Sequence, residues 1–229
     1  MQTKWMQTGF LLVGLATLTG VTARAQTDVA ASLYGAFNGT TTANGVTQSP
    51  SNAAGGLLEV RHIAKPWFGY EGTYSFNRAN QTYSEKTYPV CGVCNASTIY
   101  TQVSNNAHEL TGDWVASLKI RNLRPFALAG GGVLFDVPSG QATTTTVITL
   151  CGVGPCTPGS TTSTTSASTT TKPVFVYGAG VDWGLLPHIG LRLQYRGNLY
   201  KAPDLTKVFT STNAFTHTAE PVVGVCFRL

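Results

Sequence analysis

The sequence predicts an all-β protein built as an eight-stranded antiparallel up-and-down barrel. Three observations lead to this fold class: apolar and polar residues alternate with period two, helical periodicity is nearly absent after residue 27, and short and long connections alternate along the chain. The composition agrees, because only 11% of the residues are charged and 25 are Gly. Such a composition excludes coiled coils, helical bundles and highly charged disordered chains.

Residues 1–25 have the three parts of a secretory signal peptide. Lys4 supplies the charge, the stretch from Gly9 to Val21 is apolar, and Ala23-Arg24-Ala25 is an A-x-A cleavage site. A retained anchor is disfavoured, because the apolar stretch is shorter than the roughly 20 residues that a spanning helix needs. We therefore expect an exported barrel domain at 26–229. Its charge is too weakly positive to predict a nucleic-acid partner.

The period-two pattern places strands at particular positions. Tight connections are expected at Lys65-Pro66, Asn122-Leu123 and Pro187-His188, and long ones separate the other strands. A barrel with tight turns at one rim and long loops at the other predicts this alternation, although a soluble sandwich or lipocalin-like barrel also uses hairpins. The predicted strands are 28–38, 55–64, 67–84, 105–121, 124–138, 172–186, 189–201 and 216–229.

Charged residues of both signs share the polar face of these strands. The interior of an eight-stranded barrel is only wide enough for side chains, and a buried charge without a partner costs several kcal/mol. Acids and bases in equal numbers could pair with one another there as a network of buried ion pairs. The predicted interior network is Glu59, Arg61, Glu71, Glu109, Asp113, Lys119, Arg121, Asp182, Arg192, Arg196, Glu220 and Arg228.

The opposite face of the strands is rich in aromatic residues. Rings at this density on an outer surface would precipitate a soluble protein, whereas acyl chains and the membrane–water interface suit them. A closed barrel also pairs its backbone groups internally, as lipid requires. The sequence therefore predicts membrane contact through Phe68, Tyr70, Tyr74, Phe76, Trp114, Phe175, Tyr177, Trp183, Tyr195 and Phe227.

The stretch 175–184 (FVYGAGVDWG), followed by 190–196 (GLRLQYR), resembles the penultimate hairpin of the small OmpA-like and OmpX-like outer-membrane barrels. Residues 223–229 are similar to the C-terminal signal that the barrel-assembly machinery recognises in that family. The resemblance implies a monomer in the Gram-negative outer membrane, in contact with its lipid. It also implies a role in envelope integrity or adhesin-like surface interaction through extracellular loops, with no cofactor. A narrow porin-like channel and a lipid-modifying enzyme are the alternatives.

Four cysteines form two local pairs in predicted loops: Cys91 with Cys94, and Cys151 with Cys156. Structural disulfides are the main expectation in an exported protein. A Cys₄ zinc site and a redox site are the alternatives, and spacing leaves the disulfide pairing open. Cys226, on the polar face of the last strand, is expected to be a buried small side chain.

Catalysis is not predicted. The histidines are His62, His108, His188 and His217, and only His217 with Glu220 suggests an acid–base pair, to which no motif adds a nucleophile. The glycines at 130–132, 178 and 180 are expected to give room for bends and inner side chains. Residues 157–171, with 12 Ser or Thr among 15, are expected to be mobile and solvated.

Overall fold

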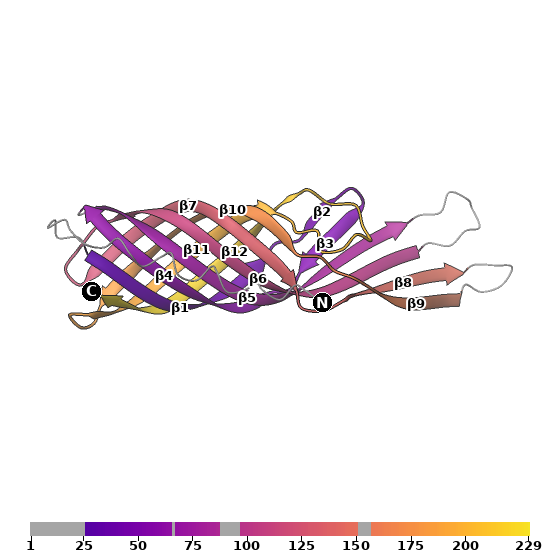
Figure 1. Cartoon of the computed structure of the whole chain (residues 1–229), viewed down its shortest axis with the longest axis horizontal. Coiled ribbons are helices and arrows are strands. Elements are labelled where there is room, and N and C mark those ends of the chain that lie inside the picture. The colour runs from indigo at the N-terminus through magenta and orange to yellow at the C-terminus, as the bar shows by residue number, and fades with distance from the viewer. Residues whose placement is uncertain (1–25, 66, 88–96, 151–156) are drawn as a thin grey trace, which may run out of the picture.

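The computed structural model describes residues 26–65, 67–87, 97–150 and 157–229, and these form one closed antiparallel barrel with a projecting sheet (Figure 1). The predicted signal peptide and the four loop cysteines lie outside the described residues. Among the residues described, no helix has the length and hydropathy needed to cross a bilayer. The strands of the barrel wall are β1 (Gln26–Asn38), β4 (Ala53–Lys65), β5 (Phe68–Thr87), β6 (Ser97–Ser117), β7 (Leu123–Pro138), β10 (Thr170–Gly184), β11 (Ile189–Lys201) and β12 (Phe215–Arg228).

Each wall strand pairs antiparallel with its neighbours in the order β1, β4, β5, β6, β7, β10, β11, β12. The last strand then returns to the first: β12 pairs with β1 from Asp28 opposite Arg228 to Asn38 opposite Thr218. The barrel wall therefore has no free edge along the closed part. The predicted eight-stranded up-and-down barrel is confirmed.

Tight turns join wall strands at one end of the barrel, here named the turn end. One turn connects β6 to β7 through Leu118–Asn122, where Ile120 pairs with Leu123 and Arg121 has a φ of 55°. Another connects β10 to β11 over 185–188, and the amides of Leu185 and Leu186 donate to the carbonyl of Ile189. The turns lie close to the predicted positions, but the strand predicted at 105–121 ends at Ser117.

The long connections at the other end are largely β structure, which corrects the prediction of loops there. β5 and β6 continue past the barrel, and four further strands extend them into what we call the projecting sheet (Figure 1). One of them pairs with β5 and one with β6, and each of these carries a second added strand on its other side. The added strands are β2 (Thr41–Ala43), β3 (Val46–Pro50), β8 (Ala142–Leu150) and β9 (Thr157–Thr165).

The Ser/Thr-rich stretch shows why the loop prediction was wrong. Residues 157–165 form β9, which pairs with β8 from Ala142 opposite Thr165 to Leu150 opposite Thr157. Thr is β-branched and favours strands, so pairing with a Thr-rich neighbour orders a segment that has little to bury. Its side chains from 159 to 164 are nevertheless exposed, as expected.

Residues 202–214, here named the cap segment, cover the inner face of the projecting sheet. Leu205 is fully buried against Tyr83, Val103 and Ala142. The Tyr83 hydroxyl donates to the carbonyl of Pro203 at 2.7 Å and accepts from the amide of Leu205 at 3.3 Å. Burial raises the pKa of this Tyr83 phenol, which lies in the projecting part of β5. The cap segment thus gives the projecting sheet a small core of its own.

Candidate functional site

The two faces of the wall carry opposite kinds of side chain, and the polar face is the inner one. Along β11, Arg192 and Arg196 are fully buried in the lumen, whereas Leu193 and Tyr195 between them are exposed outside. On β6 the outward Trp114 is 62% exposed, while Asp113 beside it is buried. Alternation of successive side chains across a strand produces this separation. The molecule is therefore the inside-out counterpart of a soluble barrel.

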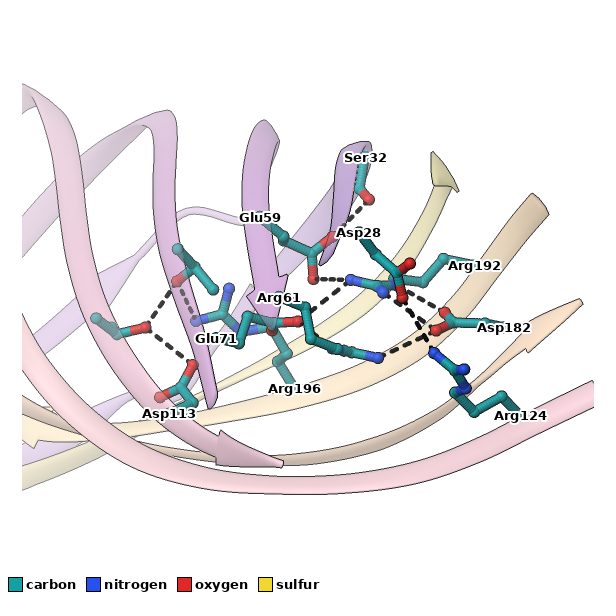
Figure 2. A network of polar contacts seen from close by, with 12 residues as sticks. Asp28, Ser32, Glu59, Arg61, Glu71, Asp113, Arg124, Asp182, Arg192 and Arg196 are labelled. Atoms are coloured by element: carbon teal, nitrogen blue, oxygen red, sulfur yellow. Dashed lines mark hydrogen bonds and ion pairs between the residues drawn. The ribbon is translucent and has the colours of Figure 1, made fainter. Parts of the chain in front are cut away.

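Five charged side chains meet at the centre of the lumen in what we call the central ion network: Glu59, Arg61, Glu71, Asp182 and Arg192. Arg61 Nε is 2.6 Å from Glu71 Oε2, and Arg61 Nη1 is 3.1 Å from Asp182 Oδ2. Arg192 contacts all three acids, with Nε 2.7 Å from Asp182 Oδ1 and Nη1 3.2 Å from Glu59. Figure 2 shows these groups converging from different strands. All five side chains are buried, so the network occupies the centre of the lumen out of contact with solvent.

Apolar side chains share the lumen with the charges, and the sequence analysis did not identify them as interior. The ring of Phe126 lies under Arg61, whose Cζ is 3.9 Å from the ring centroid, and Arg192 is 5.4 Å away. A guanidinium over an aromatic face is stabilised electrostatically, most strongly where water is excluded. Phe126 packs in a buried cluster with Val115, Leu128, Leu134, Val174, Val176 and Tyr200.

The predicted network was wrong at its turn-end members. Lys119 and Arg121 are exposed in the turn between β6 and β7, because β6 ends before them. Arg228 is half-buried at the end of β12 and has no ion pair among the described residues. The buried base at this end is Arg124, whose Nη1 is 3.2 Å from Asp28 Oδ2. Asp28 and Arg124 lie near the starts of β1 and β7, and strand ends are where sequence alternation assigns the faces least well.

The balance of charge predicted for the lumen was also wrong. Towards the projecting sheet, Arg196 pairs with Glu109 at 3.1 Å, and Asn198 Nδ2 donates to the same carboxylate at 2.9 Å. No other base is fully buried in this half among the residues described, although several acids are. The eight buried acids are Asp28, Glu59, Glu71, Glu109, Asp113, Asp136, Asp182 and Glu220, against four buried arginines, Arg61, Arg124, Arg192 and Arg196.

The even-numbered glycines of β7 and β10 lie on the inner face of the wall and permit close approach of neighbouring strands, whereas Gly131 lies on the outer face. A Cβ on Gly132 would meet the carbonyl of Leu110, and a Cβ on Gly130 would meet that of Gly112. Gly178 and Gly180 face β11 in the same way. The part of their predicted role that concerns room for inner side chains is confirmed, because Phe126 lies against Gly180 and Leu128 against Gly178.

The predicted membrane-facing rings lie on the outer face. All ten are exposed except Phe68, which is half-buried and stacks on Trp114 with centroids 5.4 Å apart. Two histidines join this surface: Nδ1 of His108 is 2.9 Å from the Tyr74 hydroxyl, and Nε2 of His217 is 3.0 Å from that of Tyr177. Tyr and His carry polar tips that suit a membrane interface.

The structure separates the one acid–base pair that the sequence suggested. His217 points outward on β12 and bonds Tyr177, whereas Glu220 points into the lumen. Residues of opposite parity on one strand face opposite sides of the wall, so the two cannot act on one substrate. Within the part of the chain that is described, no three His, Cys, Asp or Glu side chains converge as a metal site. Cys226 is buried and forms no disulfide with any residue that the structure describes.

The closed register and the two faces define the architecture. The fold is that of the small eight-stranded outer-membrane barrels. No protein-family model and no curated protein sequence matches the chain.

Solved structures of outer-membrane barrels are similar to this barrel in overall form. Ail, the attachment invasion locus protein of Yersinia pestis, solved with the heparin analogue sucrose octasulfate, is 12% identical with a TM-score of 0.41, covering 90% of this chain and 99% of that chain. Neisserial surface protein A is 12% identical with a TM-score of 0.39, covering 90% and 97%. OprG from Pseudomonas aeruginosa is 9% identical with a TM-score of 0.46, covering 89% and 95%. Similarity at this level transfers neither activity nor ligand.

Proposed function

We propose that this chain is an outer-membrane protein that presents its projecting sheet at the cell surface as a binding surface, on a barrel that does not conduct. The observation that carries the proposal is the continuation of β5 and β6 beyond the barrel into an ordered sheet. The barrel wall closes with eight strands, so the four added strands are not needed for closure.

The membrane assignment is supported by the exposed aromatic surface together with the buried charges. A barrel that places rings outside and ion pairs inside is stable in hydrocarbon and would aggregate in water. In such barrels the tight turns face the periplasm and the longer connections face the exterior. The projecting sheet would then stand outside the cell. The exposed apolar residues of β12, ending at Phe227, also fit recognition by the barrel-assembly machinery.

The closed lumen argues against the porin-like alternative. Arg61, Arg192 and their acids fill the centre of the barrel, and Phe126 packs beneath them. Opening a water path would break buried ion pairs, each costing several kcal/mol. We expect the purified barrel to give no unitary conductance steps in planar bilayers. Regular steps that vanish after denaturation would favour the channel instead.

β9 is the element of the projecting sheet best placed to bind a partner. Among the described strands it pairs with β8 alone, and it stands last in the order of strands in the sheet. An edge strand offers unpaired N–H and C=O groups to an added strand. Charged side chains are the usual protection of such edges, and β9 carries none between Thr157 and Thr165.

The experiment places charge on this edge. Thr162 and Thr164 are exposed on β9, and their joint replacement by Lys should block strand addition. Gln102→Lys is the matched control, because Gln102 is exposed on β6 between β5 and β8 and lies on no edge. Displayed on cells that lack other adhesins, the wild type and the control should promote cell–cell sedimentation or retention on matrix-coated surfaces, and the β9 variant should not. A wild type no more adhesive than cells without it would contradict the proposal.

A further inference from the structure

A small polar cavity lies in the lumen on the side of the projecting sheet, above the central ion network. Its volume is about 30 Å³, more than the roughly 10–15 Å³ that one water molecule requires. We call it the outer chamber. Residues from five of the wall strands and the end of β1 line it, and the ones that matter here are Asn105, Glu109, Asp136, Asn198 and Glu220.

The amide groups of the outer chamber are oriented by its acids. Asn198 Nδ2 donates to Glu109 at 2.9 Å, and Asn105 Nδ2 donates to Asp136 Oδ1 at 2.5 Å. Because the nitrogens contact carboxylates, the amide oxygens must point elsewhere. Neither Oδ1 has a hydrogen-bond partner, and neither do Asp136 Oδ2 and Glu220 Oε2.

These four oxygens belong to deeply buried side chains. Asn105 is 1% exposed, Asn198 and Asp136 are 2% exposed, and Glu220 is 3% exposed. A buried acceptor without a donor costs free energy comparable to a lost hydrogen bond. The residues that line the outer chamber therefore carry acceptors that need a donor or a positive charge.

The charge around the outer chamber is negative. Arg196 compensates Glu109 at 3.1 Å. Neither Asp136 nor Glu220 has a basic side chain within 4.0 Å among the described residues, and Lys172, at the start of β10, pairs instead with Asp204 of the cap segment at 3.6 Å. Two buried carboxylates thus lack a paired base, which is strongly unfavourable unless a cation neutralises them or they are protonated.

We propose that the outer chamber binds a hard cation, with Ca²⁺ preferred. The chamber offers carboxylate and amide oxygens, with no thiolate or imidazole among the lining residues, and this is the ligand set of Ca²⁺ rather than of softer metals. Ca²⁺ tolerates irregular coordination, whereas Mg²⁺ demands a near-ideal octahedral set of ligands and loses its water reluctantly.

The expected affinity is modest. No three carboxylates converge among the residues described, so amide oxygens and water must complete the coordination. Sites of low ligand charge bind Ca²⁺ with dissociation constants of about 10⁻⁴ to 10⁻³ M. An extracellular environment supplies Ca²⁺ in that range, and the outer chamber lies at the end of the lumen towards the projecting sheet.

The test uses the folded full barrel in non-ionic detergent after removal of divalent ions with a chelator. Tb³⁺ is a luminescent probe for Ca²⁺ sites, and Tyr200, which lines the chamber, should sensitise its emission. We expect saturable emission that Ca²⁺ displaces at lower concentration than Mg²⁺ does. Ca²⁺ should also raise the urea midpoint of the wild type more than NaCl of equal ionic strength.

Isosteric variants locate the site. Asp136→Asn and Glu220→Gln each remove one charge and should weaken Ca²⁺ binding about tenfold or more, because ligand charge sets calcium affinity. Asp204→Asn is the control, since this partly exposed carboxylate lies outside the chamber. Heat-modifiable gel mobility verifies that each variant folds.

The inference is overturned by an absence of saturable Ca²⁺ binding up to about 10 mM, well above the expected range, or by wild-type affinity in both chamber variants. Should one variant fail to fold, the other and the wild-type urea midpoint decide. The result is independent of the proposed binding role of β9, which the adhesion experiment tests separately.

Discussion

Arg61 and Phe126 form a stacked pair inside the barrel, with the guanidinium carbon 3.9 Å from the ring centroid. The pair shows that the lumen is stabilised by an aromatic ring as well as by ion pairs. We expect Phe126→Leu to lower the free energy of unfolding by about 1–2 kcal/mol, through loss of the cation–π contact and some packing. Phe175→Leu makes the same change on the outer face, where Phe175 is half exposed. It should lower the free energy of unfolding by less than Phe126→Leu does. Urea titration in detergent followed by tryptophan emission measures both, and equal losses would argue against the contact.

Arg192 contacts three acids of the central ion network and is fully buried. Arg192→Met keeps most of the side-chain length but leaves those carboxylates without their main partner. The expected loss is about 3–5 kcal/mol, seen as a lower urea midpoint or as failure to show heat-modifiable mobility. Lys119→Met is the control, because Lys119 is exposed in a turn, and its effect should stay within about 0.5 kcal/mol. A tolerated Arg192→Met would mean that the network contributes little to stability.

Inward and outward glycines should respond differently to the same methyl group. Gly132 faces the lumen and approaches the backbone of Leu110 and Thr111, whereas a Cβ on Gly112 would meet nothing within 4 Å. Gly132→Ala must push two strands apart, so we expect a cost of about 1–3 kcal/mol or more. Gly112→Ala should be nearly neutral. If the two variants unfold at the same urea concentration, close packing at Gly132 does not matter.

The outward tryptophans provide a direct test of the orientation of the wall. Trp114 on β6 and Trp183 on β10 are each half exposed or more, and Trp67 is exposed in the turn before β5. In vesicles whose acyl chains carry bromine, we expect strong quenching of their emission, while a water-soluble quencher should have little effect on Trp114. Trp114→Phe should remove part of the lipid-dependent quenching. Emission unaffected by brominated lipid would contradict the membrane assignment.

Much of the barrel wall could be predicted from the sequence. The strand positions and the two faces follow from period-two alternation, because a pleated backbone places successive side chains on opposite sides. Trp114 and Asp113 are neighbours in sequence and lie on opposite faces as expected. The same reasoning misplaced Lys119 and Arg121, because the alternation of residue types in the sequence continues beyond Ser117, where β6 ends.

The contents of the lumen and of the loops needed the tertiary structure. Asp28, Arg124 and Asp136 lie near strand ends and were missed, which hid the excess of acids. β9 was missed for a different reason: a Ser/Thr-rich segment buries almost nothing alone and becomes a strand only when β8 stands beside it.

By itself the sequence determined that eight alternating segments separate charges from rings, because that separation depends on local backbone geometry alone. Only the tertiary structure decided which charges meet: Asp182 reaches Arg61, 121 residues away in sequence, and Asn198 reaches Glu109, 89 residues away. Such contacts cross the lumen, so they depend on the register with which the last strand closes on the first, and no local pattern contains that register.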